Sequence, residues 1–478
     1  MAASDAVPSH SPGDNPPTAE PFDVVVVGGG VVGCAVARLL SHHQLSVALV
    51  EARDDVGAGT SKANTAILHT GFDAVPGSVE ARLVARGYQL LRAYAPTAGI
   101  SVEETGAVLV AWDDEQAATL PKLAVKAEAN GYAHAEVIDA AAVHALEPHL
   151  GDGITGGMIV PGEHLIDPWS TPIAFATEAV ANGCHLLTGF QVVGATAGAE
   201  TTTLTAADGR SVCTHHVVNA AGLHGDTLHR LLGFDGFTVR PRRGELIVFD
   251  KLARPLLGRT ILPVPTSHTK GVLVAPTVFG NIMLGPTADD IDDKGATGST
   301  RIGVDGLLQK GRRILPALLH EEVTAVYAGL RAATEHSDYQ LSAQREARYV
   351  CLGGIRSTGL TAAMALAEEA LALLAEAGCT AMPKAADEVH GIRMTPLGEG
   401  RERPYQRGGT VVCHCERVTA QELEIALTSS VPATDLDGLR RRTRALAGRC
   451  QGFYCSAEVC AHAAAVTGRP MSDWMGVQ

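Results

Sequence analysis

The sequence predicts an α/β protein. We expect a Rossmann-like domain interleaved with an α+β antiparallel-sheet domain, followed by a small helical domain at the C-terminus. Four observations carry this prediction. A strand, a glycine-rich turn and a helical pattern follow one another from Phe22. Alternating strand patterns occupy the middle of the chain, and five of the ten cysteines fall between residues 413 and 460. Aromatic residues make up only 4% of the 478 residues, and small residues let helices lie close to a sheet.

The first element is the stretch FDVVVVGGGVVGCAVARLL, in which an apolar strand over residues 24–27 leads into a helical pattern. Gly28, Gly30 and Gly33 form G-x-G-x-x-G, and a second strand ends at Glu51, 18 residues after Gly33. The glycines permit close approach of a pyrophosphate to the helix N-terminus, and the acid accepts hydrogen bonds from ribose hydroxyls. The pattern predicts a dinucleotide site without separating FAD from NAD. Its alternative is a glycine-rich turn in an unrelated α/β unit.

The segment from Gly57 to Gly87 narrows this choice. Its run TSKANTAILHTG resembles the motif TS-x-x-N-[ST]-x-x-[IL]-H-[ST]-G of the D-amino-acid oxidase and glycerol-3-phosphate dehydrogenase superfamily of flavoproteins. In that superfamily the segment after the second strand runs under the isoalloxazine ring. The resemblance implies FAD as the cofactor and places five residues near the flavin, namely Thr60, Ser61, Asn64, Thr65 and His69. Taken alone, His69 would more readily be a buried histidine with protein partners.

Two later segments resemble parts of the same superfamily that return to the cofactor. HHVVNAAGLHGDTL, residues 215–228, ends in small residues and is similar to the NAAG segment that contacts FAD, which implies contacts from Ala221 and Gly222. Residues 349–378 read as a strand, a glycine turn and a long helix. The N-terminus of that helix would stabilise negative charge on a reduced flavin. The cofactor-binding residues implied there are Gly354, Ser357, Gly359, Leu360 and Thr361.

Strands of a different character separate these segments. PRRGELIVFD and GNIMLGPTADDIDDK resemble the antiparallel strands of the superfamily's substrate domain, so the chain is expected to cross between two domains twice. The first residues are rich in Pro, Ser and acids without an apolar core, which predicts disorder. The expected division is a disordered tail at 1–20, an FAD-binding domain at 21–87, 166–236 and 331–381, a substrate domain at 88–165 and 237–330, a linker at 382–410, and a cluster domain at 411–478.

Oxidation of an alcohol or amine by flavin requires a group that holds the anionic end of the substrate and a route for the substrate proton. Arg331 stands where the superfamily has a substrate-binding arginine, and its alternative is a surface salt bridge. Arg356 replaces an acid of the hydroxyglutarate branch, and a second arginine favours an anionic substrate or an anionic flavin. His69 is the first candidate for the base and His336 the second. Many superfamily members instead release the proton through solvent.

Four of the clustered cysteines give the pattern C-x-C-x34-C-x4-C, namely Cys413, Cys415, Cys450 and Cys455. Four thiolates suffice for zinc or an iron–sulfur cluster, although zinc sites usually use C-x2-C at both ends. The spacing and the region ATDLDGLRRRTRALAGRCQGFYC resemble the bacterioferritin-associated-ferredoxin-like module. The resemblance implies a 2Fe–2S cluster on these four residues, with zinc or unliganded thiols as alternatives. Cys460 lies outside the pattern. The RRRTR run is either a solvated helix face or positive charge that stabilises the cluster.

The two resemblances together imply an FAD-dependent dehydrogenase of the glycerol-3-phosphate type. Hydride would pass to the flavin, and electrons would leave through the 2Fe–2S cluster to an acceptor protein or quinone-linked subunit. Direct use of oxygen would leave the cluster without a role. The alternatives are an L-2-hydroxyglutarate or other 2-hydroxy-acid dehydrogenase, an amine or amino-acid dehydrogenase in a hetero-oligomer, and an electron-transfer subunit without enzymatic activity.

Charge and hydropathy limit the partners further. The formal net charge of −14 argues against nucleic acid as a partner. The most apolar run is interrupted by glycines, so a transmembrane segment is not expected. The sequence therefore predicts a cytoplasmic protein, with peripheral docking on a membrane partner as the alternative.

Overall fold

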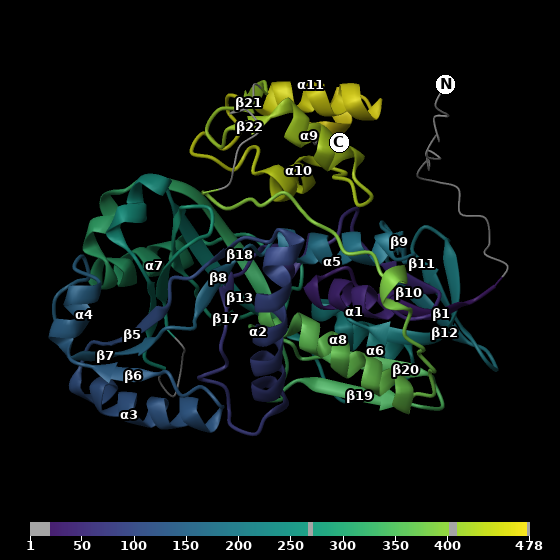
Figure 1. The fold of residues 1–478 in the computed structure, drawn as a ribbon, viewed down its shortest axis with the longest axis horizontal. Helices are drawn as coiled ribbons and strands as arrows, with labels where there is room; N and C mark the ends of the chain where they lie inside the picture. The colour runs from purple at the N-terminus through teal and green to yellow at the C-terminus, as the bar shows by residue number, and fades with distance from the viewer. Residues whose placement is uncertain (1–19, 266–270, 401–408, 476–478) are drawn as a thin grey trace.

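The computed structural model describes residues 20–265, 271–400 and 409–475. Two α/β lobes lie side by side, and a small C-terminal domain covers one edge of both (Figure 1). Apart from Glu20, the tail expected at 1–20 lies outside the described residues, as do residues 401–408 of the expected linker. Within the described ranges, no helix has both the length and the apolar character that spanning a membrane requires.

The first lobe contains an eight-stranded sheet built around β1 (Phe22–Val27). β1 pairs in parallel with β2 (Val47–Val50) and with β12 (Ser211–Asn219). The runs of valine in β1 and β2 suit parallel strands that are buried on both faces. The remaining strands are β9 (His185–Leu187), β10 (Val192–Ala197), β11 (Thr202–Ala206), β19 (Gln340–Gln344) and β20 (Tyr349–Gly353).

Helices of small residues cover this sheet. α1 (Val31–Ser41) contacts both α5 (Ser170–Ala181) and α8 (Gly359–Glu376), and α2 (Val79–Ala98) contacts α8. A Cβ atom at Gly87 would lie 2.3 Å from the carbonyl oxygen of Thr361, so the backbones of α2 and α8 touch. A larger side chain at Gly87 would separate the two helices. The lobe also contains α6 (Gly225–Leu231).

The second lobe contains a nine-stranded, largely antiparallel sheet in the order β17-β13-β16-β15-β14-β5-β7-β6, with β18 paired to β13. α7 lies against β13 and β16, while α3 and α4 lie against β7. The strands are β5 (Ala107–Ala111), β6 (Glu136–Ile138), β7 (Gly156–Val160), β13 (Arg240–Phe249), β14 (Thr260–Pro263), β15 (Leu273–Pro276), β16 (Ile282–Gly285), β17 (Asp289–Asp290) and β18 (Val323–Ala333). The helices are α3 (Asp114–Ala129), α4 (Ala140–Leu146) and α7 (Arg301–Ile314).

Short elements join the two lobes. A three-stranded sheet consists of β3 (Ile67–Leu68), β4 (Val102–Glu103) and β8 (His164–Ile166). The 3-10 turns are η1 (Thr60–Lys62), η2 (Gly222–His224), η3 (Lys251–Leu256), η4 (Pro316–His320) and η5 (Ala386–Glu388). Three of the expected domain boundaries fall inside elements, and one of them, at 165/166, divides β8. The boundary at 87/88 divides α2, and the boundary at 330/331 divides β18, which stays paired with β13 as far as Ala333.

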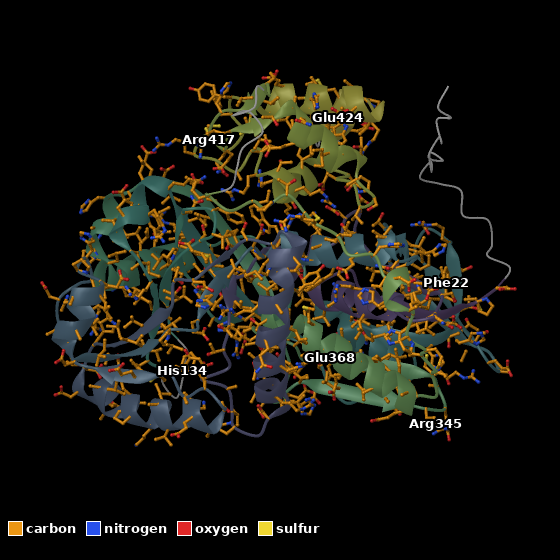
Figure 2. The ribbon with its side chains drawn as sticks, viewed as in Figure 1. Phe22, His134, Arg345, Glu368, Arg417 and Glu424 are labelled. Atoms are coloured by element: carbon orange, nitrogen blue, oxygen red, sulfur yellow. The ribbon has the colours of Figure 1, made fainter. Side chains whose placement is uncertain are left out.

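The C-terminal domain is a compact unit of short elements. Its core includes Leu423, Leu439, Val459 and Trp474, all of which are buried. Figure 2 marks this domain with the side chains of Arg417 and Glu424. Its elements are β21 (Val411–Cys413), β22 (Val418–Thr419), α9 (Ala420–Thr428), α10 (Leu436–Thr443), α11 (Ser456–Thr467) and α12 (Met471–Trp474).

Candidate functional site

The glycine-rich turn lies between β1 and α1, as the sequence predicts. Gly28 has a φ angle of +112°, and a Cβ atom there would lie 2.5 Å from the carbonyl oxygen of Ala220 at the end of β12. A Cβ at Gly33 would lie 1.8 Å from the carbonyl oxygen of Gly28. Only glycine fits these two positions, because backbone occupies the space of a side chain. The turn therefore leaves the N-terminus of α1 facing an open cavity.

Glu51 fixes the edge of this cavity. Its carboxylate accepts hydrogen bonds from the amide of Gly29 at 2.6 Å and from the amide of Arg53 at 2.9 Å. Burial raises the pKa of Glu51, and the two backbone hydrogen bonds act in the opposite direction. Ser61 lies on the other side, where its hydroxyl accepts a hydrogen bond from the amide of Val31 at 2.9 Å. Glu51 and Ser61, both in the chain that follows β2, are thus hydrogen-bonded to the glycine-rich turn and the start of α1.

Nearly all the residues predicted to bind FAD line one cavity of about 360 Å³. Its wall also includes two of the catalytic candidates, His69 and Arg356. The predicted cofactor residues in the wall are Gly28, Gly30, Glu51, Thr60, Ser61, Asn64, Thr65, Ala221, Gly222, Gly354, Ser357, Gly359 and Leu360. Gly33 and Thr361 lie behind it. Gly33 supports the turn, and the hydroxyl of Thr361 accepts a hydrogen bond from the amide of His69 at 3.0 Å.

A second cavity, of about 510 Å³, shares Thr60, Asn64, His69 and Arg356 with the first. Arg331 projects into it from β18, opposite Arg242 on β13. Burial lowers the pKa of Arg331, and the charge of Arg242 lowers it further. Arg242 makes a two-pronged ion pair with Asp290 at 2.6 and 3.0 Å. In the described part of the chain, Arg331 has no such carboxylate, and it donates one hydrogen bond to the carbonyl of Thr287 at 3.3 Å.

Arg356 stands where the two cavities meet. Its guanidinium donates to the carbonyl of Ser337 and lies 3.5 Å from a carboxylate oxygen of Glu80. His336, the second candidate for the base, is elsewhere. Its ring is hydrogen-bonded to the carbonyl of Gly236 at 2.8 Å, its side chain is 41% exposed, and it lines neither cavity. The geometry therefore argues against His336 as the base.

Glu163 is a site residue that sequence reasoning missed. Its side chain is completely buried, and one of its carboxylate oxygens lies 3.0 Å from Nδ1 of His69. Its other oxygen accepts hydrogen bonds from the amide and the hydroxyl of Thr70 at 2.6 and 2.8 Å. A carboxylate only accepts hydrogen bonds, so when His69 is neutral its proton lies on Nδ1 and its basic lone pair on Nε2. No local pattern marks Glu163, which β8 brings to His69 from 94 positions away.

The four cysteines predicted to hold a cluster form two thiol pairs, Cys413 with Cys455 and Cys415 with Cys450. Cys413 and Cys455 are buried and Cys415 is exposed. Burial raises the pKa of Cys455 to about 12. Although burial acts in the same direction on Cys450, its pKa is lowered. Hydrogen bonds from the Tyr454 amide, the Cys415 thiol and two further amides outweigh the burial.

Amides that point at a sulfur stabilise the negative charge of a thiolate-bound iron–sulfur cluster. Two thiol pairs also suit two iron atoms, each held by two cysteines. Among residues 20–265, 271–400 and 409–475, no three histidine, cysteine or acidic side chains are grouped to hold one metal ion. Four thiols are the donor set that a 2Fe–2S cluster requires, and Cys460 lies outside this set.

A dinucleotide cavity beside a cavity that contains three arginines and three carboxylates, with a separate set of four thiols, fits a redox enzyme that uses a nucleotide cofactor. Residues 23–373 match the DAO family, described as FAD dependent oxidoreductase. Residues 411–461 match the BFD-like [2Fe-2S] binding domain. The chain belongs to the DAO family of FAD dependent oxidoreductases and carries a C-terminal BFD-like 2Fe–2S domain, so its cofactors are FAD and a 2Fe–2S cluster.

Similar proteins agree with this assignment. The chain is 32% identical over 449 residues to a glycerol 3-phosphate dehydrogenase of Caloramator mitchellensis, covering 92% of this chain and 93% of that protein. It is 32% identical over 364 residues to a glycerol 3-phosphate oxidase of Mycoplasma pneumoniae, covering 74% of this chain and 95% of that protein. The solved structure of L-alpha-glycerophosphate oxidase from M. pneumoniae with FAD bound superposes with a TM-score of 0.74 at 30% identity, over 78% of this chain and 99% of that chain.

Proposed function

We propose that the chain is a glycerol-3-phosphate dehydrogenase, which oxidises the secondary alcohol of its substrate and passes the electrons to its own 2Fe–2S cluster. The observation that carries the proposal is the cavity lined by Arg242, Arg331 and Arg356, which meets the FAD cavity at His69. The names of the two similar proteins from C. mitchellensis and M. pneumoniae support the same substrate.

The charges of this cavity suit a phosphate monoester. Arg242 is neutralised by Asp290 and Arg356 by Glu80, whereas Arg331 makes no ion pair within the described residues. Arg331 has five N–H donors and donates one of them to a backbone carbonyl, so the others remain for phosphate oxygens. A bound dianion would also relieve the repulsion between Arg331 and Arg242, which now lowers the pKa of Arg331.

Glu163 and His69 supply the proton route in this proposal. Glu163 keeps the proton of neutral His69 on Nδ1, and Nε2 then accepts the hydroxyl proton of the alcohol. The carboxylate stabilises the imidazolium that results. FAD, when bound, supplies the hydride acceptor, and the cluster supplies a one-electron carrier.

The presence of the cluster domain favours a dehydrogenase over an oxidase. The M. pneumoniae oxidase is aligned over 95% of its own length but matches only 74% of this chain. The C. mitchellensis dehydrogenase matches 92% of this chain. The additional length is therefore shared with a protein that is named a dehydrogenase, and direct use of oxygen would leave the cluster without a role.

We propose that the electrons leave to an acceptor protein or a quinone-linked subunit, from a position in the cytoplasm or at the membrane surface. Phe453 and Tyr454 support an exit at the cluster. They lie between Cys450 and Cys455, are 82% and 80% exposed, and contact each other edge to face. Exposed aromatic side chains are common at protein–protein contacts.

A 2-hydroxy acid is the second candidate substrate. The guanidinium of Arg331 would hold a carboxylate as well as a phosphate. A human mitochondrial L-2-hydroxyglutarate dehydrogenase is 30% identical to the chain over 288 residues, which cover 56% of this chain and 61% of that protein. The shorter coverage and the cluster domain favour glycerol-3-phosphate.

The substrate is tested by anaerobic reduction of the holoenzyme. We expect glycerol-3-phosphate to bleach the visible flavin band without oxygen, because hydride transfer needs no other acceptor. Titrations with L-2-hydroxyglutarate, amino acids and glycerol serve as comparisons, and glycerol tests the need for the phosphate. Full bleaching by L-2-hydroxyglutarate alone would replace the proposed substrate, and no bleaching by any of these compounds would reject the dehydrogenase.

Arg331→Met tests the anion site. Loss of a charge-assisted contact with the phosphate should raise the KM for glycerol-3-phosphate about 100-fold, with a smaller change in kcat. Steady-state kinetics with an artificial acceptor measures both constants. Arg82→Met, which removes an arginine whose side chain is 57% exposed on α2, is the matched control and should leave both unchanged. An unchanged KM in Arg331→Met would contradict phosphate binding by this residue.

Glu163→Gln tests the proton route. An amide neither fixes the proton on Nδ1 of His69 nor stabilises the imidazolium, so kcat should fall about 10- to 100-fold. The acidic limb of the pH–kcat profile should move to lower pH, because the neutral amide favours neutral His69. Glu104→Gln, in which the replaced side chain is 64% exposed, is the control. A lower kcat with an unmoved profile would mean that Glu163 acts only in folding.

A further inference from the structure

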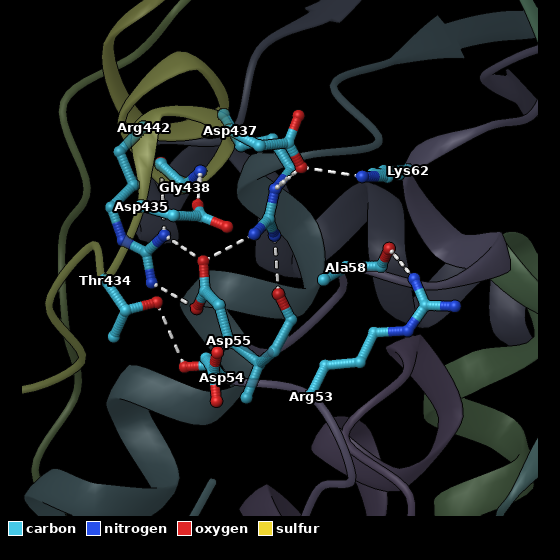
Figure 3. Close-up of polar contacts among 12 residues, drawn as sticks. Arg53, Asp54, Asp55, Ala58, Lys62, Thr434, Asp435, Asp437, Gly438 and Arg442 are labelled. Atoms are coloured by element: carbon cyan, nitrogen blue, oxygen red, sulfur yellow. Dashed lines mark hydrogen bonds and ion pairs between the residues drawn. The ribbon is translucent and has the colours of Figure 1, made fainter. Parts of the chain in front are cut away.

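The cluster domain is seated on the segments that line the FAD cavity. α10 approaches the loop 51–58, which begins with Glu51, and the turn η1, which carries Thr60 and Ser61 (Figure 3). The contacts therefore come from the same short stretch of chain that borders the cofactor. The side of this stretch facing the cavity binds the glycine-rich turn, and its other side binds the cluster domain.

A buried carboxylate is the centre of this contact. Asp55 is 3% exposed, Arg441 is 1% exposed and Arg442 is 9% exposed. One oxygen of Asp55 accepts hydrogen bonds from Arg441 at 2.5 Å and Arg442 at 2.7 Å, and the other accepts from Arg442 at 2.8 Å. Arg441 also donates to the carbonyl of Val56. The two guanidiniums thus clamp one side chain and the backbone beside it.

The cluster domain holds the two arginines in place through contacts of its own. Arg442 donates to the carbonyls of Val431 and Gly438 within its own domain, at 3.0 and 3.2 Å, so its guanidinium is oriented without Asp55. Arg441 is held by Asp437 at 3.4 Å. The first lobe contributes Asp55 to this charged group, and Lys62 reaches it from η1 through Asp437. A buried ion pair adds little net stability over apolar packing, but removing one partner leaves an uncompensated buried charge, so an arrangement that separates Asp55 from the arginines is costly.

More exposed contacts between the cluster domain and the first lobe surround the buried group. Thr434 donates to the carbonyl of Asp54 at 3.1 Å, and Lys62 pairs with Asp437 at 2.6 Å. The side chains of Lys62 and Asp437 are about one-third exposed, at 34% and 35%, so solvent screens this pair. The buried group around Asp55 is therefore the contact that most strongly orients the cluster domain on the first lobe.

A second contact lies closer to the cluster cysteines. Arg444 is stacked over Phe279, with its guanidinium carbon 4.2 Å from the ring centroid, and it pairs with Glu416 at 3.2 Å. Glu416 follows Cys415 and also binds Lys251 of the second lobe at 3.1 Å. The cluster domain is thus held at two separated places, which prevents rotation about either one.

We propose that Asp55, with Arg441 and Arg442, is a positioning residue that holds the 2Fe–2S domain in one orientation against the FAD-binding loop. Electrons then pass from flavin to cluster without a domain movement. Each alcohol oxidised yields a ketone, two protons and two electrons, and the cluster takes the electrons one at a time and gives each to the external acceptor. The docking itself needs only the two cofactors, while its kinetic test rests on the proposed function for a substrate that reduces the flavin.

Asp55→Asn in the full-length holoenzyme is the test, and Asp54→Asn is its control. Asp54 is the neighbouring acid and is exposed, so its variant removes the same charge from the same loop without reaching the arginines. Two measurements are made on each protein. Anaerobic stopped-flow mixing with glycerol-3-phosphate follows flavin bleaching and cluster bleaching separately, and small-angle X-ray scattering measures the maximum dimension of the particle.

We expect Asp55→Asn to reduce its flavin at the wild-type rate, while its cluster is reduced about 10-fold more slowly or worse, because breaking the buried ion pair releases the cluster domain and increases the distance between the two cofactors. The maximum dimension should increase. Asp54→Asn should match the wild type in all three quantities. Unchanged cluster reduction and an unchanged dimension in Asp55→Asn would overturn the proposal.

Two outcomes are separated by this design. If glycerol-3-phosphate leaves the flavin of every variant oxidised, the proposed substrate fails, while scattering still decides the docking. If Asp55→Asn does not accumulate as holoenzyme, Arg442→Met replaces it, because that variant keeps the Arg441–Asp55 pair and only weakens the clamp. Slower cluster reduction together with wild-type flavin reduction in Arg442→Met supports the proposal. Wild-type reduction rates for both cofactors contradict it.

Discussion

The twelve residues from Glu51 to Lys62 connect the cofactor cavity with the cluster domain, because each of the two lies against one face of this segment. On one face, Glu51 and Ser61 accept hydrogen bonds from the glycine-rich turn and the first turn of α1. On the opposite face, Asp55 is enclosed by two arginines of the cluster domain. The same stretch of backbone therefore borders the cofactor cavity and supports the cluster domain.

Each lobe, with its own sheet, supplies residues to a different one of the two cavities. The first lobe supplies the FAD cavity, and the second lobe brings Arg331 and Arg242 to the adjoining cavity on adjacent strands of an antiparallel sheet. His69 and Arg356 stand where the two cavities meet, so the substrate alcohol and the cofactor approach each other at the lobe boundary. Glu163 is completely buried behind His69, and its carboxylate contacts Nδ1 of the imidazole at 3.0 Å.

Local patterns in the sequence predict much of this site, and contacts over long separations escape them. The Gly28 turn, the acid at Glu51 and the cysteine spacing are short motifs whose geometry follows from their own residues. The Glu163–His69 contact and the clamp of Asp55 by Arg441 join residues 94 and 386 positions apart. A buried acid carries no periodic or spacing signal, so only the fold reveals its partner. The expected boundaries at 87/88 and 330/331 fall inside α2 and β18, because composition marks neither the end of that helix nor the end of that strand.

The central claim is that one chain carries electrons from an alcohol through FAD to its own cluster. Rapid-freeze electron paramagnetic resonance after anaerobic mixing with glycerol-3-phosphate tests it directly, because a reduced 2Fe–2S cluster is paramagnetic. The account predicts that the cluster signal grows after the flavin is bleached, at a rate that does not depend on protein concentration, since the transfer is internal. A bleached flavin with a cluster that stays silent, or a signal whose rate rises with protein concentration, would contradict it.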